Sequence, residues 1–357
     1  MRVLLDATVV TRKPKGAGRV ILNLAATLPT VDPTREYLAV AFPEGAQALI
    51  GRSGADVATV PASRGLPWER RGLSEWSARL GADAVITVRE VVFPGAPPTV
   101  LHLAEPPAYR LQSELRQRPP SHVAKDVLLQ SLLRRSIRLA AAVTAASEAT
   151  AEWLRERYRI KPPVIQPGID PVFLELGKEP MGEPYLLHPA TGDRRENTDL
   201  VLRAYATAGI GTPLVLVGTP ASVGEALTAR ASALGIDRSA IRIKGWVSDE
   251  ELRDLYRGAV ALVHPARYEG FAGLQPLEAM AQGIPVIALE APGVTEALLD
   301  VAVLVPDDMT ALGAAMRRFS NRDSPANTGE IGKAFARGFT WERAARLFVE
   351  VLDDLDD

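Results

Sequence analysis

Short apolar runs alternate with longer amphipathic segments along the whole chain. In the first half, the apolar runs predict β-strands at Val3–Asp6, Tyr37–Phe42, Val57–Val60, Ala84–Thr87, Val100–Leu103 and Ala142–Ala145. The second half predicts further strands at Tyr185–Leu187, Leu214–Val217, Ile241–Ile243, Ala259–Val263, Val286–Ala288 and Val303–Val305. Helical patterns lie between the strands, among them Arg19–Leu28, Trp68–Leu80, His122–Leu139 and Glu148–Tyr158. Continuous apolar strands that alternate with helices are typical of parallel sheets covered on both faces, so we expect an α/β chain of two doubly wound, Rossmann-like units.

Chain length and turn-forming residues indicate where the two units meet. The chain has 357 residues, which suits two domains of about 150 residues each. Proline and glycine gather between Lys161 and Gly168, and the stretch from Gly177 to Pro184 has no clear pattern. We therefore expect the hinge in one of these two stretches.

Composition argues against several classes of function. Hydrophobic residues make up 47% of the chain and charged residues 24%, which is the balance of a soluble globular protein. The formal net charge of −2 offers no basic field for nucleic acid. The chain contains no cysteine, which excludes disulfides, thiolate metal sites and cysteine nucleophiles.

The two ends of the chain give expectations about location and order. The chain opens directly as a strand, without the pattern of a signal peptide. No apolar run reaches the ~18 residues needed to span a bilayer. We therefore expect a cytoplasmic protein with at most peripheral membrane contact. The acidic stretch from Asp353 to Asp357 predicts a frayed, solvated tail.

The stretch from Tyr268 to Glu278 carries the clearest functional signal. It follows an apolar run and leads into a predicted short helix, Pro276–Gln282, which Gly283 ends. A strand, a glycine-bearing loop and an exposed helix N-terminus form an anion site, because unpaired N–H groups and the positive end of the helix dipole meet there. Glu269 and Glu278 flank this site. Phosphates in such a cradle, with sugar and ribose hydroxyls on the two acids, would suit a nucleotide sugar.

Three features of the first half lie where predicted strands end. Ligands of open α/β sheets bind beyond the carboxyl ends of strands, so two such units predict a site in a cleft that both face. Gly16-Ala17-Gly18 opens the first helix as either a plain turn or a ligand contact. It lacks the third glycine of a dinucleotide fingerprint, which argues against a nicotinamide-dependent dehydrogenase. His102 closes a strand and is either a core histidine or a donor to a sugar hydroxyl, and Ser147 is a predicted helix cap.

The loop from Asp193 to Thr198 offers a second set of candidates. Asn197 or Thr198 is a plausible N-cap for the helix that follows, which is a purely structural interpretation. Arg195, in preference to Arg194, would complete a diphosphate clamp opposite a helix N-terminus, because charge-assisted hydrogen bonds to phosphate are strong.

Two more patterns have a structural and a functional interpretation. Ser248 and Glu251 form a predicted capping box, which leaves Trp246 and Val247 as a possible wall for a nucleobase. The basic stretch from Arg110 to Arg138 predicts a solvated helix face, with acceptor or membrane-surface contact as the alternative. The remaining histidines make no metal pattern and lie at positions 122, 188 and 264.

These residues resemble those of a known family, the family 4 retaining glycosyltransferases, which have the GT-B fold. The most specific match runs from Glu269 to Val286, EGFAGLQPLEAMAQGIPV, and is similar to the family's E-G-F-G-L-P-x-L-E-A-M-A-x-G-x-P-V. Supporting matches cover nearly the whole chain and include Gly16 to Arg19, His102, Ser147, Gly168-Ile169-Asp170, Gly245 to Leu252 and Phe339 to Ala345.

The resemblance implies a domain division and a set of site residues. Because the last helix of such proteins returns to the N-terminal domain, we expect an acceptor-side domain of residues 1–167 plus 340–357, and a donor-binding domain of residues 168–339. The implied catalytic residues are His102 beside the reacting sugar and Glu269 on its hydroxyls. The implied donor-binding residues are Gly18, Arg195, Asn197, Val247, Phe271, Ala272, Gly273, Leu274 and Glu278. Among these, Glu278 would hold the ribose, Phe271 to Leu274 would meet the phosphates, and Gly18 would approach them from the other domain.

The resemblance also implies a reaction. A nucleoside diphosphate sugar, of the UDP or GDP type, would give its sugar to a hydroxyl acceptor such as a glycan, a lipid-linked glycan or a small molecule. Retention is described in this family as front-face attack through an oxocarbenium-like transition state, with no metal and no cofactor. Two other interpretations stay open, a nucleotide-sugar epimerase or hydrolase on the same fold and a non-catalytic nucleotide-sugar binder.

The chain departs from the family pattern at two places. The family spaces its two acids eight positions apart, whereas Glu269 and Glu278 are nine apart, with one extra residue near Ala272. The family's usual G-R is Ala190-Thr191 here, and its lysine is Glu196. One cation of the usual clamp is therefore missing, which leaves more of the diphosphate charge to Arg195.

Overall fold

The chain folds into two compact units. The computed structural model describes residues 1–14, 16–61, 68–92, 94–106, 120–179, 182–270, 273–298, 301–321 and 328–356, with backbone alone at 69, 70, 120–123, 125, 126, 296 and 297. The first unit comprises Met1–Gly168 and Thr340–Asp357, and the second comprises Ile169–Phe339. The chain first passes from one unit to the other between Gly168 and Ile169, at the end of the stretch from Lys161 to Gly168 that is rich in proline and glycine.

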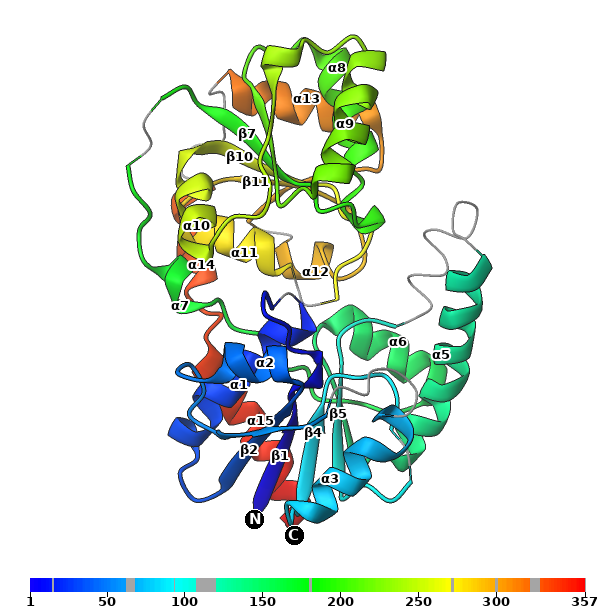
Figure 1. Cartoon of the computed structure of the whole chain (residues 1–357). Helices are drawn as coiled ribbons and strands as arrows, with labels where there is room; N and C mark the ends of the chain where they lie inside the picture. The colour runs from blue at the N-terminus through cyan, green and yellow to red at the C-terminus, as the bar shows by residue number, and fades with distance from the viewer. Residues whose placement is uncertain are drawn as a thin grey trace. The chain divides into compact units, whose positions relative to one another are not determined.

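The first unit contains a six-stranded parallel sheet in the order β3-β2-β1-β4-β5-β6 (Figure 1). Its strands are β1 Arg2–Asp6, β2 Glu36–Ala41, β3 Asp56–Thr59, β4 Ala84–Thr87, β5 Thr99–Leu103 and β6 Ala142–Ala145. The helices and turns between and after them are η1 Ala7–Val9, α1 Ala17–Val31, α2 Pro43–Leu49, the π-helical turn η2 Trp68–Gly72, α3 Leu73–Arg79, α5 Pro120–Leu139, α6 Glu148–Tyr158 and α15 Trp341–Asp356.

The second unit repeats this architecture with the strand order β12-β11-β10-β7-β8-β9. Its strands are β7 Tyr185–Pro189, β8 Leu214–Val217, β9 Ile241–Ile243, β10 Ala259–His264, β11 Val286–Leu289 and β12 Val303–Val305. Its helices are α7 Pro171–Leu174, η3 Arg194–Glu196, α8 Thr198–Ala208, α9 Ala221–Ala233, η4 Arg238–Ala240, α10 Asp249–Gly258, α11 Leu274–Ala281, α12 Thr295–Leu298, α13 Met309–Ser320 and α14 Thr328–Ala336. The inner strands β7, β8, β10 and β11 are almost wholly buried, which explains why they appear in the sequence as continuous apolar runs, whereas the edge strands β9 and β12 are only partly buried.

Strand order reverses once in each sheet. In the first sheet β1 pairs with both β2 and β4, and in the second β7 pairs with both β8 and β10. Loops that leave the carboxyl ends of the two central strands diverge at such a point and leave a crevice where ligands of doubly wound sheets bind. In the second unit these loops follow Pro189 and His264, so the fold places the two predicted donor-binding loops beside each other.

The elements agree closely with the prediction, and the α/β, doubly wound fold class is confirmed. Each predicted strand lies within two residues of an observed one. Helix α11 begins at Leu274, two residues before the predicted start, because Gly273 takes a left-handed conformation with φ 74° and lets the helix begin at the next residue. Gly283, with φ 76°, follows the end of the helix as predicted.

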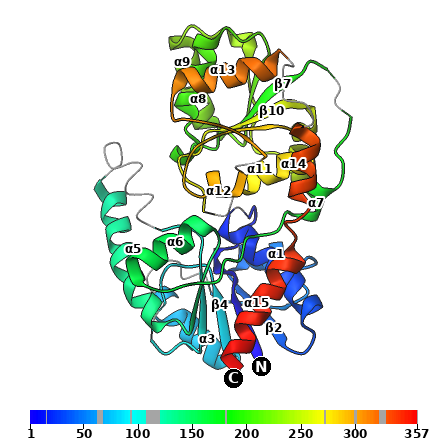
Figure 2. The same ribbon diagram turned by 180° about the vertical axis from the view of Figure 1, so that it is seen from behind.

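The acidic C-terminus is ordered, so the expectation of a frayed tail is wrong. Helix α15 continues to Asp356 and packs against α1 on one side of the first sheet (Figure 2). Arg35 donates from its Nη2 to Asp353 at 2.7 Å and to Asp356 at 2.6 Å. The sequence pattern concealed this contact because Arg35 lies more than 300 positions away in the chain.

We predict that Phe348→Ala destabilises the first unit by about 3–5 kcal/mol, since it removes a fully buried ring from α15. The ring packs edge-on against His102, with 5.1 Å between centroids. Urea unfolding measures the loss. The control is Asp354→Ala, an exposed position on the same helix, and equal midpoints for the two variants would contradict the assignment of α15 to the core.

Candidate functional site

The candidate site is built on the loops that follow β7 and β10 in the second unit. The β7 loop contains η3 and ends at Asn197, where α8 begins. The β10 loop runs from His264 towards Gly273, where α11 begins. Two of its predicted phosphate-binding residues, Phe271 and Ala272, lie outside the described residues.

The N-terminus of α11 presents backbone hydrogen-bond donors that no described residue uses. Gly273 provides no side-chain cap, and the backbone N–H groups of Leu274 and Gln275 have no partner among the described residues. Pro276 has no N–H to satisfy, which makes proline compatible with this turn. Both Leu274 and Gln275 are partly exposed, so an anion can approach the positive end of the helix.

Glu269 is held in place by a histidine and by a glycine. Its Oε1 lies 2.7 Å from Nε2 of His264, at the end of β10. Its backbone N–H donates to the carbonyl of Pro292 at 3.1 Å. A Cβ at Gly293 would lie 2.0 Å from the carbonyl oxygen of Glu269, so only glycine permits this close approach.

Glu278 is almost fully buried on α11. Its exposed fraction is 1%, and its Oε2 accepts a hydrogen bond from the hydroxyl of Tyr256 at 3.1 Å. The ring of Tyr256 packs edge-on against Phe173, with 5.9 Å between centroids, which fixes the direction of its hydroxyl. The bond from Tyr256 and the position on α11 hold this buried carboxyl group in place.

The β7 loop does not hold its arginine free for a ligand. The guanidinium of Arg195 binds Asp193, with Nη2 2.7 Å from Oδ2, and it lies 5.9 Å from the ring centroid of Tyr268. Both charged groups are more than a third exposed, so the pair contributes little to stability. The role of Arg195 in a diphosphate clamp stays a prediction. It requires the guanidinium group to bind phosphate either while it is still paired with Asp193 or after it has left Asp193.

Asn197 is the N-cap of α8 but does not cap it with its side chain. It takes a left-handed conformation with φ 54°, and its buried Nδ2 has no hydrogen-bond partner among the described residues. Oγ1 of Thr219, in the loop after β8, is also buried, and no residue that the structure describes pairs with it. Buried polar atoms without partners are rare, and a ligand is one explanation for them. Asn197 was a predicted donor-binding residue, whereas Thr219 had no sequence signal.

Glu196 stands where the resembling family has a lysine, and it binds its own loop. Its Oε2 accepts the backbone N–H of Thr191 at 2.7 Å, and its Oε1 accepts the Thr191 hydroxyl at 2.7 Å. Burial raises the pKa of Glu196 to about 7, and the nearby charge of Asp193 also raises it, whereas the Thr191 bonds and His264 oppose this. Near neutral pH this carboxyl group is therefore divided between its charged and neutral forms.

His188 and His264 lie near Glu196, at the ends of β7 and β10. Burial lowers the pKa of His188 to about 4, so the ring is neutral. Its Nδ1 lies 2.8 Å from the carbonyl of Val263, and its Nε2 lies 3.0 Å from the hydroxyl of Thr198. A neutral ring that donates to Val263 accepts from Thr198, which ties the start of α8 to β10. The sequence showed both histidines as scattered residues, because parallel strand pairing is what brings their positions together.

Of the two residues predicted to form a wall for a nucleobase, only Trp246 is largely exposed. Trp246 is 52% exposed, while Val247 packs against the core of the second unit. The predicted capping box is confirmed, since Ser248 accepts from the Glu251 N–H at 3.1 Å and Glu251 accepts from the Ser248 N–H at 2.8 Å. This box fixes the start of α10, directly after Val247.

Two predicted site residues lie in the first unit. A Cβ at Gly18 would lie 3.0 Å from the carbonyl oxygen of Val9, so packing of α1 against η1 explains that glycine. His102 is 1% exposed, its Nδ1 lies 2.9 Å from Oγ1 of Thr144, and burial lowers its pKa to about 4. These contacts match the core-histidine alternative for the ring. The ligand-binding roles of Gly18 and His102 stay predictions. The predicted cap at Ser147 is confirmed by its bond from the Thr150 N–H.

The described parts of the chain contain neither a metal-binding cluster nor a membrane-spanning helix. There, no group of three or more His, Cys, Asp or Glu side chains is placed to hold a metal ion. Within the same residues, none of the helices has the length and apolar character required to cross a bilayer.

Two family models match consecutive parts of the chain. The one described as "Glycosyltransferase Family 4" matches residues 9–173, and the one described as "Glycosyl transferases group 1" matches residues 175–335. The boundary between the two matches falls close to the boundary between the two structural units.

Curated relatives match part of the chain. O-antigen chain mannosyltransferase B of Escherichia coli is 33% identical over 164 residues, which covers 44% of this chain and 42% of the relative. D-inositol 3-phosphate glycosyltransferase of Streptomyces avermitilis is 34% identical over 170 residues, or 43% of this chain and 36% of the relative. The matched region therefore spans less than half of the length of these relatives.

Solved structures match the chain over almost its full length. Sucrose-phosphate synthase from Thermosynechococcus elongatus aligns with a TM-score of 0.78 and 18% identity, covering 99% of this chain and 98% of that one. Anabaena HepE, solved in complex with UDP-glucose, aligns with a TM-score of 0.74 and 18% identity, covering 99% of each chain. At this identity the likeness establishes the fold, which is GT-B.

We predict that Gly293→Ala destabilises the second unit and displaces Glu269, because its methyl group would collide with the Glu269 carbonyl. Gly283→Ala is a matched control, since Gly283 has nearly the same positive φ but open space around a Cβ. The control measures the cost of a left-handed alanine, about 1–2 kcal/mol. The collision should add about 1–3 kcal/mol more in urea unfolding. Equal losses in the two variants would show that the collision is relieved without cost.

We predict a pH-dependent stability difference between Glu196→Gln and the wild type. Between the ordinary pKa of 4.5 and the folded value of about 7, the folded chain holds a proton that the unfolded chain has released. The contribution of Glu196 to the unfolding free energy therefore falls as pH rises through this window and is constant above it. Glutamine can accept from the Thr191 N–H through its amide oxygen and donate from its amide nitrogen to the Thr191 hydroxyl oxygen, as the O–H of neutral glutamic acid does. The variant should gain on the wild type by up to about 1.4 kcal/mol per pH unit across the window. Urea unfolding at pH 5 and pH 7.5 measures this, and parallel pH profiles would contradict it.

Proposed function

Because this chain belongs to the family 4 glycosyltransferases, we propose that it transfers a sugar from a nucleoside diphosphate sugar to a hydroxyl acceptor. The observation that carries the proposal is the arrangement around α11. Free N–H groups at its first turn are accompanied by Glu269 before the helix and Glu278 within it. This arrangement provides donors for phosphate and acceptors for hydroxyl groups on one short segment.

In this proposal each part of the donor meets a group of matching chemistry. The diphosphate binds the N–H groups of Leu274 and Gln275, where the helix dipole favours negative charge. The ribose hydroxyls donate to Glu278, and hydroxyls of the transferred sugar donate to Glu269. The buried donor Nδ2 of Asn197 finds a partner in the ligand. Uridine is the base we favour, with guanosine next, and the relative HepE was solved with UDP-glucose.

Glu196 changes how phosphate charge is balanced in this proposal. A lysine at this place would meet the diphosphate with a positive charge, whereas Glu196 brings none and is neutral only when protonated. Donor binding therefore depends on the helix dipole, on Arg195 and on a proton at Glu196. The site binds a dianion best at pH values below about 7.

The proposed chemistry is retaining front-face transfer. The acceptor oxygen attacks the anomeric carbon on the side of the leaving group, and the bond from that carbon to the phosphate oxygen breaks. The proton of the acceptor hydroxyl passes to a phosphate oxygen of the departing nucleotide. Preorganised N–H donors at α11 stabilise the charge that develops on this leaving group.

One observation favours a second candidate function, that of a non-catalytic nucleotide-sugar binder. The Thr191–Glu196 pair closes the β7 loop with a carboxyl group at a place where transferases of the resembling family have a cation. Weaker leaving-group stabilisation would slow transfer more than binding. Donor binding without product across a broad set of hydroxyl acceptors would support this candidate.

We predict distinct effects for the two acids in calorimetric titrations with UDP, UDP-glucose and their guanosine counterparts. Glu278→Gln should weaken bare nucleotide and nucleotide sugar alike by about tenfold, since a charge-assisted hydrogen bond to the ribose is lost. Glu269→Gln should leave bare nucleotide unchanged and reduce the preference among sugars. Glu225→Gln, at an exposed position on α9, is the control. Wild-type nucleotide affinity in both acid variants would contradict the assigned roles, and no binding by the wild type would contradict the proposed function.

A further inference from the structure

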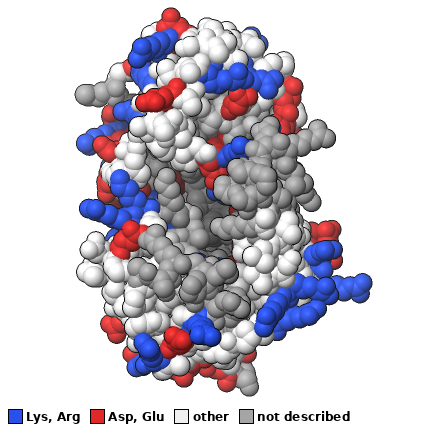
Figure 3. Space-filling model, turned by 45° about the vertical axis from the view of Figure 1, so that its right-hand side comes forward, with Lys and Arg blue, Asp and Glu red and all other residues white. Residues whose placement is uncertain are grey.

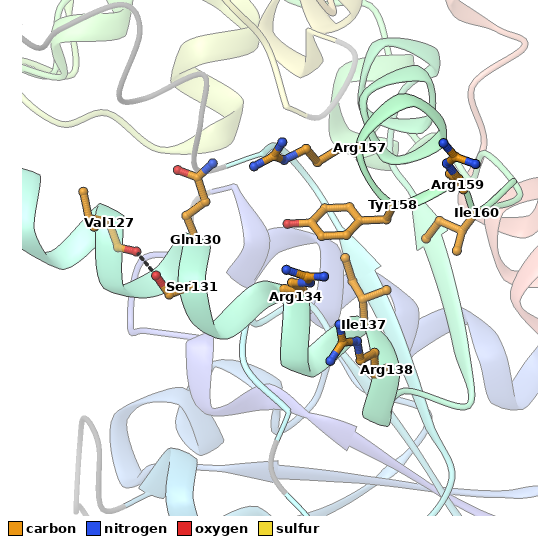
Figure 4. A pocket seen from close by; sticks show the side chains of 10 residues that line it. All are labelled: Val127, Gln130, Ser131, Arg134, Ile137, Arg138, Arg157, Tyr158, Arg159 and Ile160. Atoms are coloured by element: carbon orange, nitrogen blue, oxygen red, sulfur yellow. Dashed lines mark hydrogen bonds between the residues drawn. The ribbon is translucent and has the colours of Figure 1, made fainter.

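A cavity in the first unit is lined by arginines that the proposed transfer does not use. It has a volume of about 840 Å³ and lies between the C-terminal half of α5 and the end of α6 (Figure 4). Its lining residues are Val127, Gln130, Ser131, Arg134, Ile137, Arg138, Arg157, Tyr158, Arg159 and Ile160. None of them is acidic, and Figure 3 shows Lys and Arg side chains gathered on the side of this unit that carries α5.

The four lining arginines lack carboxylate partners among the residues that the structure describes. The nearest paired arginine in sequence, Arg155, binds Glu152 and does not line the cavity. Helix dipoles account for Arg138 and Arg157, which lie in the last turns of α5 and α6. They do not account for Arg134, which lies a full turn earlier in α5.

Arg159 has an unfavourable backbone conformation. It follows α6 with φ 59°, a left-handed conformation in which glycine is normally favoured. Keeping a large side chain there costs about 1–2 kcal/mol. The guanidinium group of Arg159 places a positive charge at the cavity. Strain of this kind is a reason to look for a function of the side chain.

Tyr158 stands inside the cavity between two of the arginines. In Figure 4 its ring lies between Arg157 and Arg134, with the hydroxyl directed towards α5. Trp153 packs edge-on against the ring, with 5.3 Å between centroids, and this contact fixes its orientation. Burial raises the pKa of Tyr158, so its hydroxyl keeps its proton and can donate a hydrogen bond.

We propose that this cavity is a binding site for a phosphate-bearing ligand. Guanidinium groups bind phosphate with two parallel hydrogen bonds, and the hydroxyl of Tyr158 adds a neutral donor. Several unpaired positive charges around one cavity match a group that carries two or more negative charges. The proposal concerns α5 and α6 of the first unit and is independent of the donor site proposed on the second unit.

Two sources could present this phosphate chemistry. A free phosphorylated molecule would fill the cavity from solution. A phospholipid headgroup would enter from a membrane surface, and α5 carries exposed apolar side chains beside the cavity at Val127, Leu128 and Leu139. Inorganic pyrophosphate tests the first source. Vesicles of phosphatidylcholine, with and without phosphatidic acid, test the second.

The experiment follows the side-chain Nε–Hε signals of isotope-labelled arginine by NMR. Arg134→Gln and Arg157→Gln each remove one signal and so assign it. In the wild type, both signals should shift with pyrophosphate or with vesicles that contain phosphatidic acid. The Arg134→Gln/Arg157→Gln double variant should bind the active probe at least about tenfold more weakly. Arg135→Gln is the matched control, because Arg135 is exposed on the same helix and does not line the cavity.

Each outcome bears on the proposal. A shift with pyrophosphate supports a free ligand, and a shift with phosphatidic acid vesicles alone supports a headgroup. Absence of any shift with both probes overturns the proposal. A loss of affinity in Arg135→Gln as large as that in the double variant also overturns it, because binding would then reflect only general positive charge.

Discussion

The parallel pairing of β7 with β10 is the contact on which the candidate site depends. These strands are separated by more than 65 residues and by two other strands, yet they lie next to each other at the centre of the sheet. The pairing brings His188 and His264 to adjacent strand ends and places the loop of Glu196 beside that of Glu269. Without it, the two loops would present isolated polar residues. The position of the crevice therefore follows from the order of the strands in the sheet, and the side chains determine only what lines it.

Within this crevice, each acid is already engaged by a neighbour. Glu269 binds His264, Glu278 receives a hydrogen bond from Tyr256, and Glu196 binds Thr191. Such partners orient carboxyl groups that would otherwise be free to rotate, which lowers the entropy lost when a ligand binds. The cation Arg195 is engaged in the same way by Asp193.

The sequence predicted the fold and the site segment well because both are local or periodic features. Apolar runs revealed the strands, and the spacing of Ser248 and Glu251 revealed a capping box that the structure contains. Glycine and proline around α11 revealed the helix N-terminus, with an error of two residues at its start. The sequence could not reveal contacts made across the fold. The bond between Arg35 and the C-terminal acids is one example, and the collision that excludes a side chain at Gly293 is another.

Residues that depend on tertiary packing were also the ones whose roles were missed. His264 showed no pattern in the sequence because its partner Glu269 is reached through a loop of irregular shape. Only the structure reveals that the hydroxyl of Thr219 is buried, with no partner in the part of the chain that it describes. Glu196 was visible as a departure from a resembling family, but its hydrogen bonds to Thr191 and its altered pKa follow from burial. The residue type of Glu196 could be seen in the sequence, but its protonation state depends on its burial in the fold.

The return of α15 to the first unit has a consequence for synthesis on the ribosome. Residues 169–339 leave the ribosome before α15 does, so the second unit has its complete sequence while the first still lacks one helix. During that interval the surface that later receives Phe348 and Leu352 is uncovered. Apolar surface of this kind is where nascent chains associate wrongly or recruit chaperones. The unit that begins the chain is therefore the last to be finished.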